Sequence, residues 1–232
     1  MRTASIITSI LLLISIPAAA QRRVAADVEV KTVYQGKVTT VNSQVWCQSD
    51  GTMVSVYQSP YTYYALTNPN GEFKLYVPST KEVYSDRRDD YSNKDDILYL
   101  FMTGKSDDLG LTSFGYRLAS SVNEDGLLKR TYVPAVPGKG VAKVELVLEN
   151  WLPIYIAYID GSGNVLNKTY LSSYARYPRI ALPLRSTSIT YTARKDSTIV
   201  RTIYSNVRID TNDPMFGFKV PSDAKPTTVR PR

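Results

Sequence analysis

The sequence reads VAKVELVLE from Val141 to Glu149, and apolar and polar side chains alternate along it. One set of alternate positions holds Ala142, Val144, Leu146 and Leu148, and the other holds Lys143, Glu145, Val147 and Glu149. Successive side chains of a β-strand point to opposite faces of the sheet. The stretch therefore predicts a strand with one buried face and one solvated face.

Residues 199–209 show a similar alternation near the end of the chain. Ile203, Val207 and Ile209 are expected on one face, opposite Thr202, Tyr204, Asn206 and Arg208. A sheet buried on both sides would show continuous apolar runs instead. The two stretches therefore favour one antiparallel sheet, curved into an open, unclosed barrel over an apolar interior.

Turn signals divide the rest of the chain into short alternating runs. Asp50-Gly51, Asn70-Gly71 and Asp125-Gly126 supply the positive φ angles that tight hairpins need. This spacing is typical of an antiparallel meander and predicts roughly ten strands. The Pro- and Gly-rich stretch 130–140 is expected to connect two halves of the sheet.

One stretch departs from the β pattern. Asp95 and Asp96 supply acidic residues at a helix start, Ile97, Leu100 and Phe101 follow at helical spacing, and Gly104 can end the helix. We expect a short covering helix at residues 95–103 and a further turn near residues 107–114.

The N-terminus has the three parts of a secretory signal. Arg2 precedes an apolar run over residues 6–16, and Ala18, Ala19 and Ala20 form a small-residue cleavage site before Gln21. The run is well short of the ~20 residues that cross a bilayer. We expect an exported protein in which residues 21–232 form one domain. Cys47 is the single cysteine, so no internal disulfide can form.

The composition argues against several functions. The formal charge is +7, but Lys and Arg are scattered among Asp and Glu, so no stripe suited to nucleic acid appears. The chain has no histidine, which excludes Ser-His-Asp and Cys-His catalysis and zinc sites built from Cys and His. We expect no catalytic residues, no metal and no cofactor. The acidic pairs at 89–90, 95–96 and 107–108 are expected to cap helices or turns, although a hydrolase using such a pair is the least favoured alternative.

Two segments resemble the outer-membrane lipoprotein carrier (LolA-like) family. Residues 68–83 resemble that family's hairpin of a glycine turn, an aromatic strand and a proline. The second runs from Leu152-Pro153 through the turn at 160–164 and the strand at 199–209, and ends at residues 214–224, where spaced phenylalanines lead into a proline and an acidic turn. The order and spacing cover most of the chain after residue 20.

The resemblance implies a periplasmic carrier whose concave apolar face holds acyl chains of lipoproteins or other lipids. It also implies transient membrane-protein donors and acceptors, and we expect a monomer. The family's long helix ahead of the first strand has little room here, because only residues 21–29 precede the alternating run. The helix at 95–103 is therefore expected to be the main cover.

The alternating pattern selects the residues expected to face this cavity. They are Val54, Val56, Phe73, Leu75, Val144, Leu146, Leu148, Ile156 and Ile203, beneath Ile97, Leu100 and Phe101 of the covering helix. Alternating apolar residues also line fully packed cores. The sequence therefore leaves open a second class of function, an exported structural or protein-interaction module whose half-barrel is filled by its own side chains.

Overall fold

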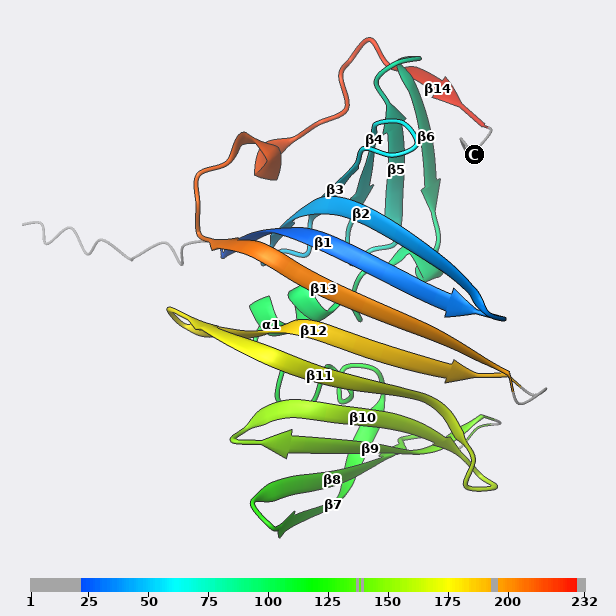
Figure 1. The fold of residues 1–232 in the computed structure, drawn as a ribbon, viewed down its shortest axis with the longest axis vertical. Helices are drawn as coiled ribbons and strands as arrows, with labels where there is room; N and C mark the ends of the chain where they lie inside the picture. Colours follow the sequence, from blue (N-terminus) through cyan, green and yellow to red (C-terminus); the bar gives the residue numbers. More distant parts are fainter. Residues whose placement is uncertain (1–21, 137, 139, 193–195, 229–232) are drawn as a thin grey trace, which may run out of the picture.

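The computed structural model describes residues 22–136, 138, 140–192 and 196–228 (Figure 1). The signal peptide expected at residues 1–20 and its cleavage site before Gln21 lie outside this part. The described residues contain no apolar helix of membrane-spanning length.

In the described part of the chain, fourteen strands make up one sheet. They are β1 (Arg23–Tyr34), β2 (Lys37–Gln48), β3 (Met53–Tyr57), β4 (Tyr63–Thr67), β5 (Glu72–Val77), β6 (Glu82–Arg87), β7 (Tyr116–Glu124), β8 (Leu127–Pro134), β9 (Val141–Glu149), β10 (Leu152–Asp160), β11 (Val165–Tyr177), β12 (Ile180–Tyr191), β13 (Ser197–Ile209) and β14 (Lys225–Thr227). Their order across the sheet is β14-β6-β5-β4-β3-β2-β1-β13-β12-β11-β10-β9-β8-β7, so the sheet stays open.

Neighbouring strands are antiparallel except for β14, which runs parallel to β6. The open, mainly β architecture expected from the sequence is therefore confirmed, with more strands than expected. The additional strands are short or are separated from their neighbours only by tight turns. Asp125 and Gly126, for example, join β7 to β8 with φ angles of 52° and 78°, the positive pair that a two-residue hairpin requires.

The sheet consists of two halves joined by pairing between β1 and β13. Strands β1 to β6 extend from this junction toward one edge, and the chain then crosses to the far edge and returns through β7 to β13. The crossing is made by residues 88–115, which we call the crossover segment. The stretch 130–140, expected to join the halves, instead contains the end of β8 and leads into its neighbour β9.

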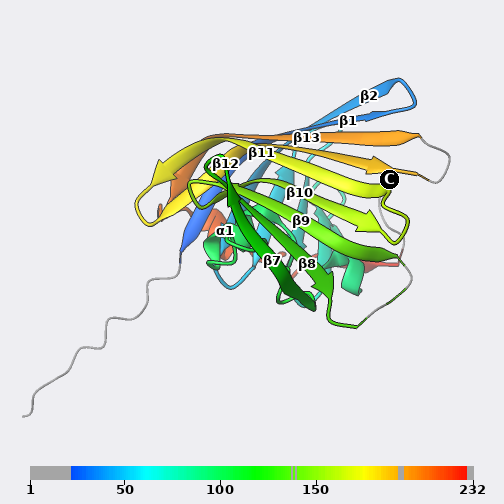
Figure 2. The same cartoon turned by 90° about the horizontal axis from the view of Figure 1, so that it is seen from below.

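The crossover segment lies in the concave side of the curved sheet (Figure 2). It contains η1, a 3-10 turn (Asp89–Tyr91), and α1 (Ile97–Met102). Asp96 caps α1 by accepting a hydrogen bond from the Leu98 amide at 2.8 Å, which satisfies a free N–H of the first turn. The expected helix is confirmed.

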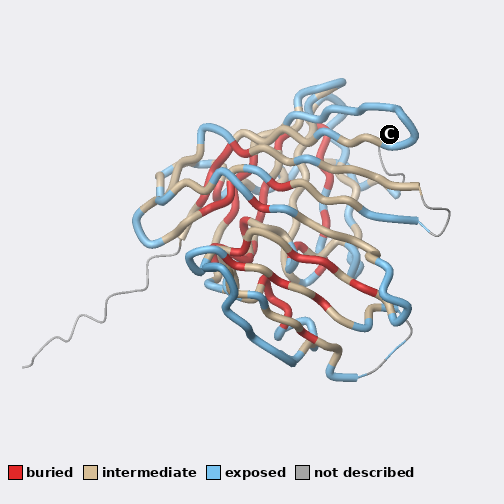
Figure 3. Tube along the Cα trace, turned by 60° about the horizontal axis from the view of Figure 1, so that its bottom comes forward, coloured by how far each residue is buried: buried red, intermediate tan, exposed pale blue. Residues whose placement is uncertain are grey.

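The apolar side of α1 fills the curve of the sheet. Leu98, Leu100, Phe101 and Met102 are buried, as are Leu109 and Leu111 further along the crossover segment. They pack in one cluster with strand residues that include Val24, Cys47, Val144, Leu146, Leu148 and Leu182. Buried residues accordingly gather in the middle of the strands, whereas the hairpin tips are exposed (Figure 3).

A second, smaller core lies on the convex side. There η2, a 3-10 turn (Pro214–Gly217), places Phe216 against Trp46, Val54 and Val56. The chain then runs to β14 and pairs beside β6. The C-terminal segment thus covers the convex side of β2 and β3, while the crossover segment covers the concave side.

Candidate functional site

A pocket of about 240 Å³ opens between the crossover segment and the concave face of the sheet. We call it the inner pocket. Its apolar lining comes from both walls: Ile97, Leu100, Leu109 and Phe114 on the crossover segment, and Ile156 and Leu171 on the sheet. Its polar lining is Asp95, Tyr158, Thr169, Ser186 and Ser188.

Strand register explains why these sheet residues meet. Ile156 of β10 pairs with Thr169 of β11, which pairs with Ser188 of β12, and directly paired residues project to the same face. The oxygens Oγ1 of Thr169 and Oγ of Ser188 are 2.7 Å apart. One hydroxyl donates to the other, so the pair retains one O–H that can donate to a further acceptor.

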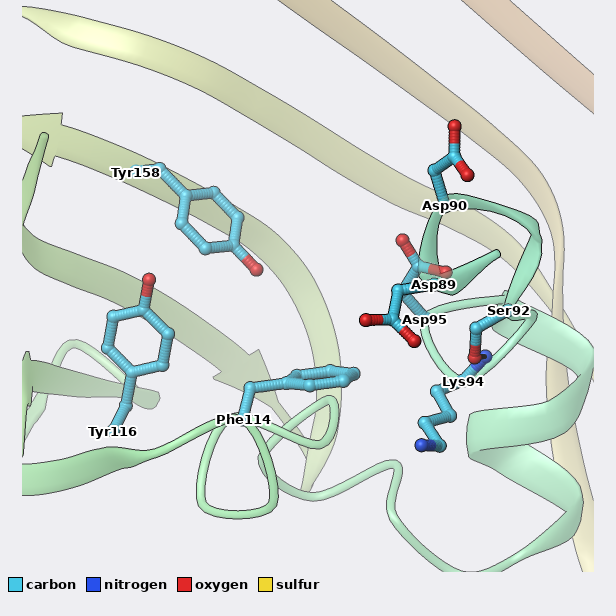
Figure 4. Close-up of a pocket in the computed structure, with 8 residues that line it drawn as sticks. All are labelled: Asp89, Asp90, Ser92, Lys94, Asp95, Phe114, Tyr116 and Tyr158. Carbon is cyan, nitrogen blue, oxygen red and sulfur yellow. Dashed lines mark hydrogen bonds between the residues drawn. The ribbon is translucent and has the colours of Figure 1, made fainter. Parts of the chain in front are cut away.

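A larger pocket of about 670 Å³ adjoins the first at Asp95, Phe114 and Tyr158. We call it the outer pocket, and Figure 4 shows its lining. Two tyrosines on the sheet, Tyr116 and Tyr158, face an acidic wall on the crossover segment. Phe114 lies between the tyrosines and this wall. That wall consists of Asp89, Asp90, Ser92, Lys94 and Asp95. The two pockets together form a groove that is apolar within and polar at its mouth.

The electrostatics of the groove follow from burial. Burial raises the pKa of Tyr158 to about 12, with smaller contributions from Tyr116 and Asp95, so its hydroxyl remains a hydrogen-bond donor at neutral pH. Burial also raises the pKa of Asp96 to about 6, although the hydrogen bonds from the Leu98 and Tyr99 amides lower it. The end of α1 beside the groove therefore holds a carboxyl group that is poorly solvated when ionised.

The acidic pairs have structural partners. Asp90 accepts bonds from the Arg88 guanidinium at 2.7 and 2.9 Å, Asp96 caps α1, and Asp108 accepts from the amides of Gly110 and Thr112. Among the described residues, no group of three or more His, Cys, Asp or Glu side chains could hold a metal ion. The groove therefore offers apolar contacts within and hydrogen-bonding and charged groups at its mouth.

Several residues selected from the sequence converge beneath α1. Val144, Leu146, Leu148 and Ile156 lie in the same cluster as Ile97, Leu100 and Phe101. Most are fully packed, since Leu146 is 0% exposed and Leu148 is 1% exposed. Only Ile156, Ile97 and Leu100 also line the inner pocket.

The other selected residues lie elsewhere. Phe73 and Leu75 form a separate cluster on β5 with Tyr63, Tyr84 and Tyr91. Val54 and Val56 lie on the convex face, packed against Phe216. Sequence alone predicted them in the cavity because apolar and polar side chains alternate along β3. Alternation alone does not say which face of the strand points toward the concave side.

Ile203 lies on the convex face rather than the expected concave face, because β13 contains a β-bulge. The register changes from Ala25 opposite Arg208 to Asp27 opposite Ser205, which adds one residue to β13 and reverses the alternation there. Tyr204 consequently joins the concave core together with Val207. Ile203, its neighbour in the strand, points to the convex face and is half-buried.

Sequence reasoning missed several groove residues. Leu109 and Phe114 fall within the expected turn near residues 107–114, but that turn was not expected to cover the sheet. Thr169, Ser186 and Ser188 carry no hydropathy signal because each is polar. Leu171 stands alone among polar neighbours, and only the pairing of β11 with β10 reveals its position.

No protein-family model matches the sequence, and no curated protein matches it either. Solved structures do match the fold. A DUF1329 family protein from Desulfovibrio piger is 16% identical with a TM-score of 0.55, and the match covers 85% of this chain and 90% of that one. A LolA superfamily protein from Nitrosomonas europaea is 12% identical, with the same TM-score and coverage.

A third structure is a domain described as an outer-membrane lipoprotein-sorting protein, from Vibrio parahaemolyticus. It is 13% identical, with a TM-score of 0.51, and the match covers 82% of this chain and 86% of that domain. At these identities the likeness concerns the fold. The open antiparallel sheet with a short helix in its concave side is therefore a LolA-like fold, as the sequence resemblance predicted.

Proposed function

We propose that this protein is a divergent LolA-like carrier, an exported, non-catalytic monomer that binds the acyl chains of a lipoprotein or another lipid in the periplasm. Residues 21–232 would form the single carrier domain, and cargo would be received from and delivered to membrane proteins. The acyl chain would enter the groove and lie on the concave face, with α1 as a movable cover.

One observation carries the proposal: the apolar floor of the sheet is covered by a helix rather than by further strands. The segment that contains this helix is hydrogen-bonded to the rest of the protein on either side of α1, through Asn93 before it and Asp107 after it. Strand residues around Leu146 and Ile156 pack against α1, and the crossover segment adds no strand to the sheet. The inner pocket already opens along one side of this contact. At about 240 Å³ it is smaller than the ~300–1,000 Å³ of small-molecule sites, so a whole acyl chain would require α1 to move.

The free energy lost when α1 leaves the sheet is comparable to the free energy gained when an acyl chain takes its place. Burial of a large apolar side chain contributes roughly 1.5–3 kcal/mol, so displacing Leu98, Leu100, Phe101 and Met102 would cost about 6–12 kcal/mol. Each methylene of a ligand contributes ~0.8 kcal/mol. A chain of about sixteen carbons therefore offers about 12 kcal/mol and can replace the helix.

The filled concave side also favours the second class of function. Leu98, Leu146 and Leu182 are each 2% exposed or less, so side chains of the protein itself fill this part of the half-barrel. If α1 does not move, the protein is an exported interaction module. The two proposals make opposite predictions about lipid content.

The first experiment is extraction of the purified full chain into organic solvent, followed by mass spectrometry. A carrier should yield lipid in an amount that approaches one cargo molecule per protein. An interaction module should yield none, and fluorescent fatty acid added afterwards should not bind.

A pair of variants tests the location. Ser188→Phe places a ring in the inner pocket and should lower fatty-acid affinity at least tenfold. Thr187→Phe, the next residue of β12, places the same ring on the opposite face and serves as the matched control. Equal binding by both folded variants would exclude the groove as the site.

A further inference from the structure

The convex face of the central strands carries cationic and aromatic side chains side by side. We call the set Lys31, Arg201, Lys168, Tyr155, Tyr170 and Tyr191 the basic aromatic face. Tyr155 pairs with Tyr170 across β10 and β11, and Arg201 pairs with Lys31 across β13 and β1. Thr187 of β12 links the two pairs, because it lies opposite both Tyr170 and Arg201.

These residues point away from the groove. Tyr155 is adjacent to Ile156, and Tyr170 is adjacent to Thr169, and these neighbours line the inner pocket. Side chains alternate along a strand, so the basic aromatic face lies on the convex side. In Figure 2 no described segment lies over these strands.

Aliphatic side chains continue the face along a second row. Val38, Val33 and Ile199 pair across β2, β1 and β13, and Ile199 also pairs with Ile189 of β12. Val38 is 61% exposed and Tyr170 is 43% exposed. Contiguous exposed apolar groups on a sheet face are typical of an interaction surface.

Lys168 is held by its aromatic neighbours. Its Nζ lies 5.9 Å from the centre of the Tyr170 ring and 5.7 Å from that of Tyr191, within the range of cation–π attraction. A hydrogen bond with Tyr191 raises the pKa of Lys168, so the ammonium is charged at neutral pH. The arrangement fixes a cation in an exposed aromatic setting.

The two rows contain the three cations Lys31, Lys168 and Arg201. Glu145 of β9 ends the second row, opposite Ala157, but its carboxylate is paired with Nζ of Lys143 at 2.6 Å, so the face keeps a net positive charge. Glu29, which points to the same face of β1, lies two residues beyond Lys31 and opposite Ile203. Tyrosine, aliphatic groups and lysine or arginine together match the interface of an anionic bilayer, where aromatic rings lie at the level of the head groups and cations pair with phosphates.

We propose that the basic aromatic face docks this protein on a membrane surface that contains anionic lipid. Tyr155, Tyr170 and Tyr191 would lie among the head groups, and Lys31, Lys168 and Arg201 would contact their phosphates. The groove faces the other way, so docking leaves it open. This inference does not rest on the carrier function, because vesicle binding needs no cargo in the groove.

The test is co-sedimentation of the full chain with vesicles of phosphatidylcholine, with and without an equal share of phosphatidylglycerol. We expect binding only where phosphatidylglycerol is present, and weaker binding as salt rises. Each cation near the surface changes the partition coefficient by about fivefold. The triple variant Lys31→Gln, Lys168→Gln, Arg201→Gln should therefore bind roughly a hundredfold more weakly.

The matched control is the triple variant Lys74→Gln, Lys219→Gln, Lys225→Gln, which removes the same charge from exposed positions outside the face. It should keep most of the vesicle binding. Circular dichroism checks that both triple variants fold, and the single variant Tyr170→Ser provides a second reading that leaves the net charge unchanged. It should weaken binding severalfold.

Three outcomes would overturn the proposal. One is absence of wild-type binding to the anionic vesicles. Another is an equal loss in both triple variants, which would indicate attraction by net charge alone. The third is a dimer, seen by light scattering, that only the Lys31, Lys168 and Arg201 substitutions dissociate, because the occupant would then be a second copy of the chain.

Discussion

Nε1 of Trp46 donates a hydrogen bond to Oδ2 of Asp213 at 2.8 Å, and this bond joins β2 to the C-terminal segment 167 residues later. Asp213 also accepts from the Met215 amide at 2.9 Å and so caps η2. Both bonds favour the ionised carboxyl group and lower the pKa of Asp213, the Met215 bond more than the Trp46 bond. The segment that covers the convex core is therefore fixed at its start.

Trp46→Phe should destabilise the fold by about 1–3 kcal/mol, because it removes a donor to a charged acceptor and part of a buried ring. Urea unfolding followed by circular dichroism measures the change. Trp151→Phe is the matched control, since Trp151 is 73% exposed and should change stability by less than about 0.5 kcal/mol. Equal effects of the two substitutions would contradict the assigned role of the Trp46–Asp213 bond.

Asp96 should make stability depend on pH. Its pKa is about 6 in the folded protein against 3.8 in the unfolded chain, so folding favours the protonated form. Its contribution is fully present below about pH 4 and is lost as the pH rises through 6. Asp96→Asn keeps an oxygen to cap α1 and should be more stable than wild type at pH 7.5, by at most about 3 kcal/mol.

The difference between Asp96→Asn and wild type should vanish near pH 4. Thermal unfolding at several pH values measures it, with Asp95→Asn at the neighbouring exposed position as the control. A constant difference from pH 4 to 8 would show that the Asp96 carboxyl group is not the cause.

Leu146 anchors the core beneath the crossover segment. It is 0% exposed and packs in the cluster that includes the apolar residues of α1, so Leu146→Ala should cost about 2–5 kcal/mol. Val147→Ala, the next residue of β9 on the opposite and half-buried face, should cost clearly less. Denaturant midpoints compare them, and similar midpoints would place the core on the wrong face of β9.

Gly51 lies where the β2–β3 turn meets the crossover segment. A Cβ added there would lie 2.1 Å from Cγ of Pro69 and 2.8 Å from Cε2 of Tyr99, and φ is +85°. Gly51→Ala therefore combines backbone strain with a collision beside α1, and should cost more than the ~1–2 kcal/mol of a left-handed alanine.

Gly126→Ala separates these two causes, because Gly126 has φ +78° and no neighbour within 4 Å of an added Cβ. It should show the backbone cost alone. If the two variants unfold at the same denaturant concentration, the close approach of Pro69 and Tyr99 does not constrain the turn.

Much of the fold could be predicted from local chemistry. Period-two hydropathy at Val141–Glu149 indicated a strand with one buried face, and the structure buries Val144, Leu146 and Leu148 as expected. Asp-Gly and Asn-Gly placed the hairpins, and the acidic start followed by Ile97, Leu100 and Phe101 placed α1. Each of these signals depends only on a few neighbouring residues, so it can be recognised without knowing which segments pack together.

The groove could be predicted only in part. Ile156, Ile97 and Leu100 were selected from their patterns and do line it, whereas Val54 and Val56 have the same hydropathy and lie on the other side of the sheet. An alternating strand has two faces, and what covers each face is decided by segments distant in the chain. Here those segments are residues 88–115 and η2.

The sequence by itself determined the strands, their turns, the short helix and the absence of histidine chemistry, because each depends on residue type and near neighbours. Only the tertiary structure decided that the crossover segment fills the concave side. It also decided that an added residue in β13 turns Tyr204 toward the concave side and Ile203 toward the convex side. Finally, it brought cations and tyrosines from five strands onto one convex face. Those outcomes depend on which strands pair and in what register, and pairing between residues far apart in the chain leaves no local pattern.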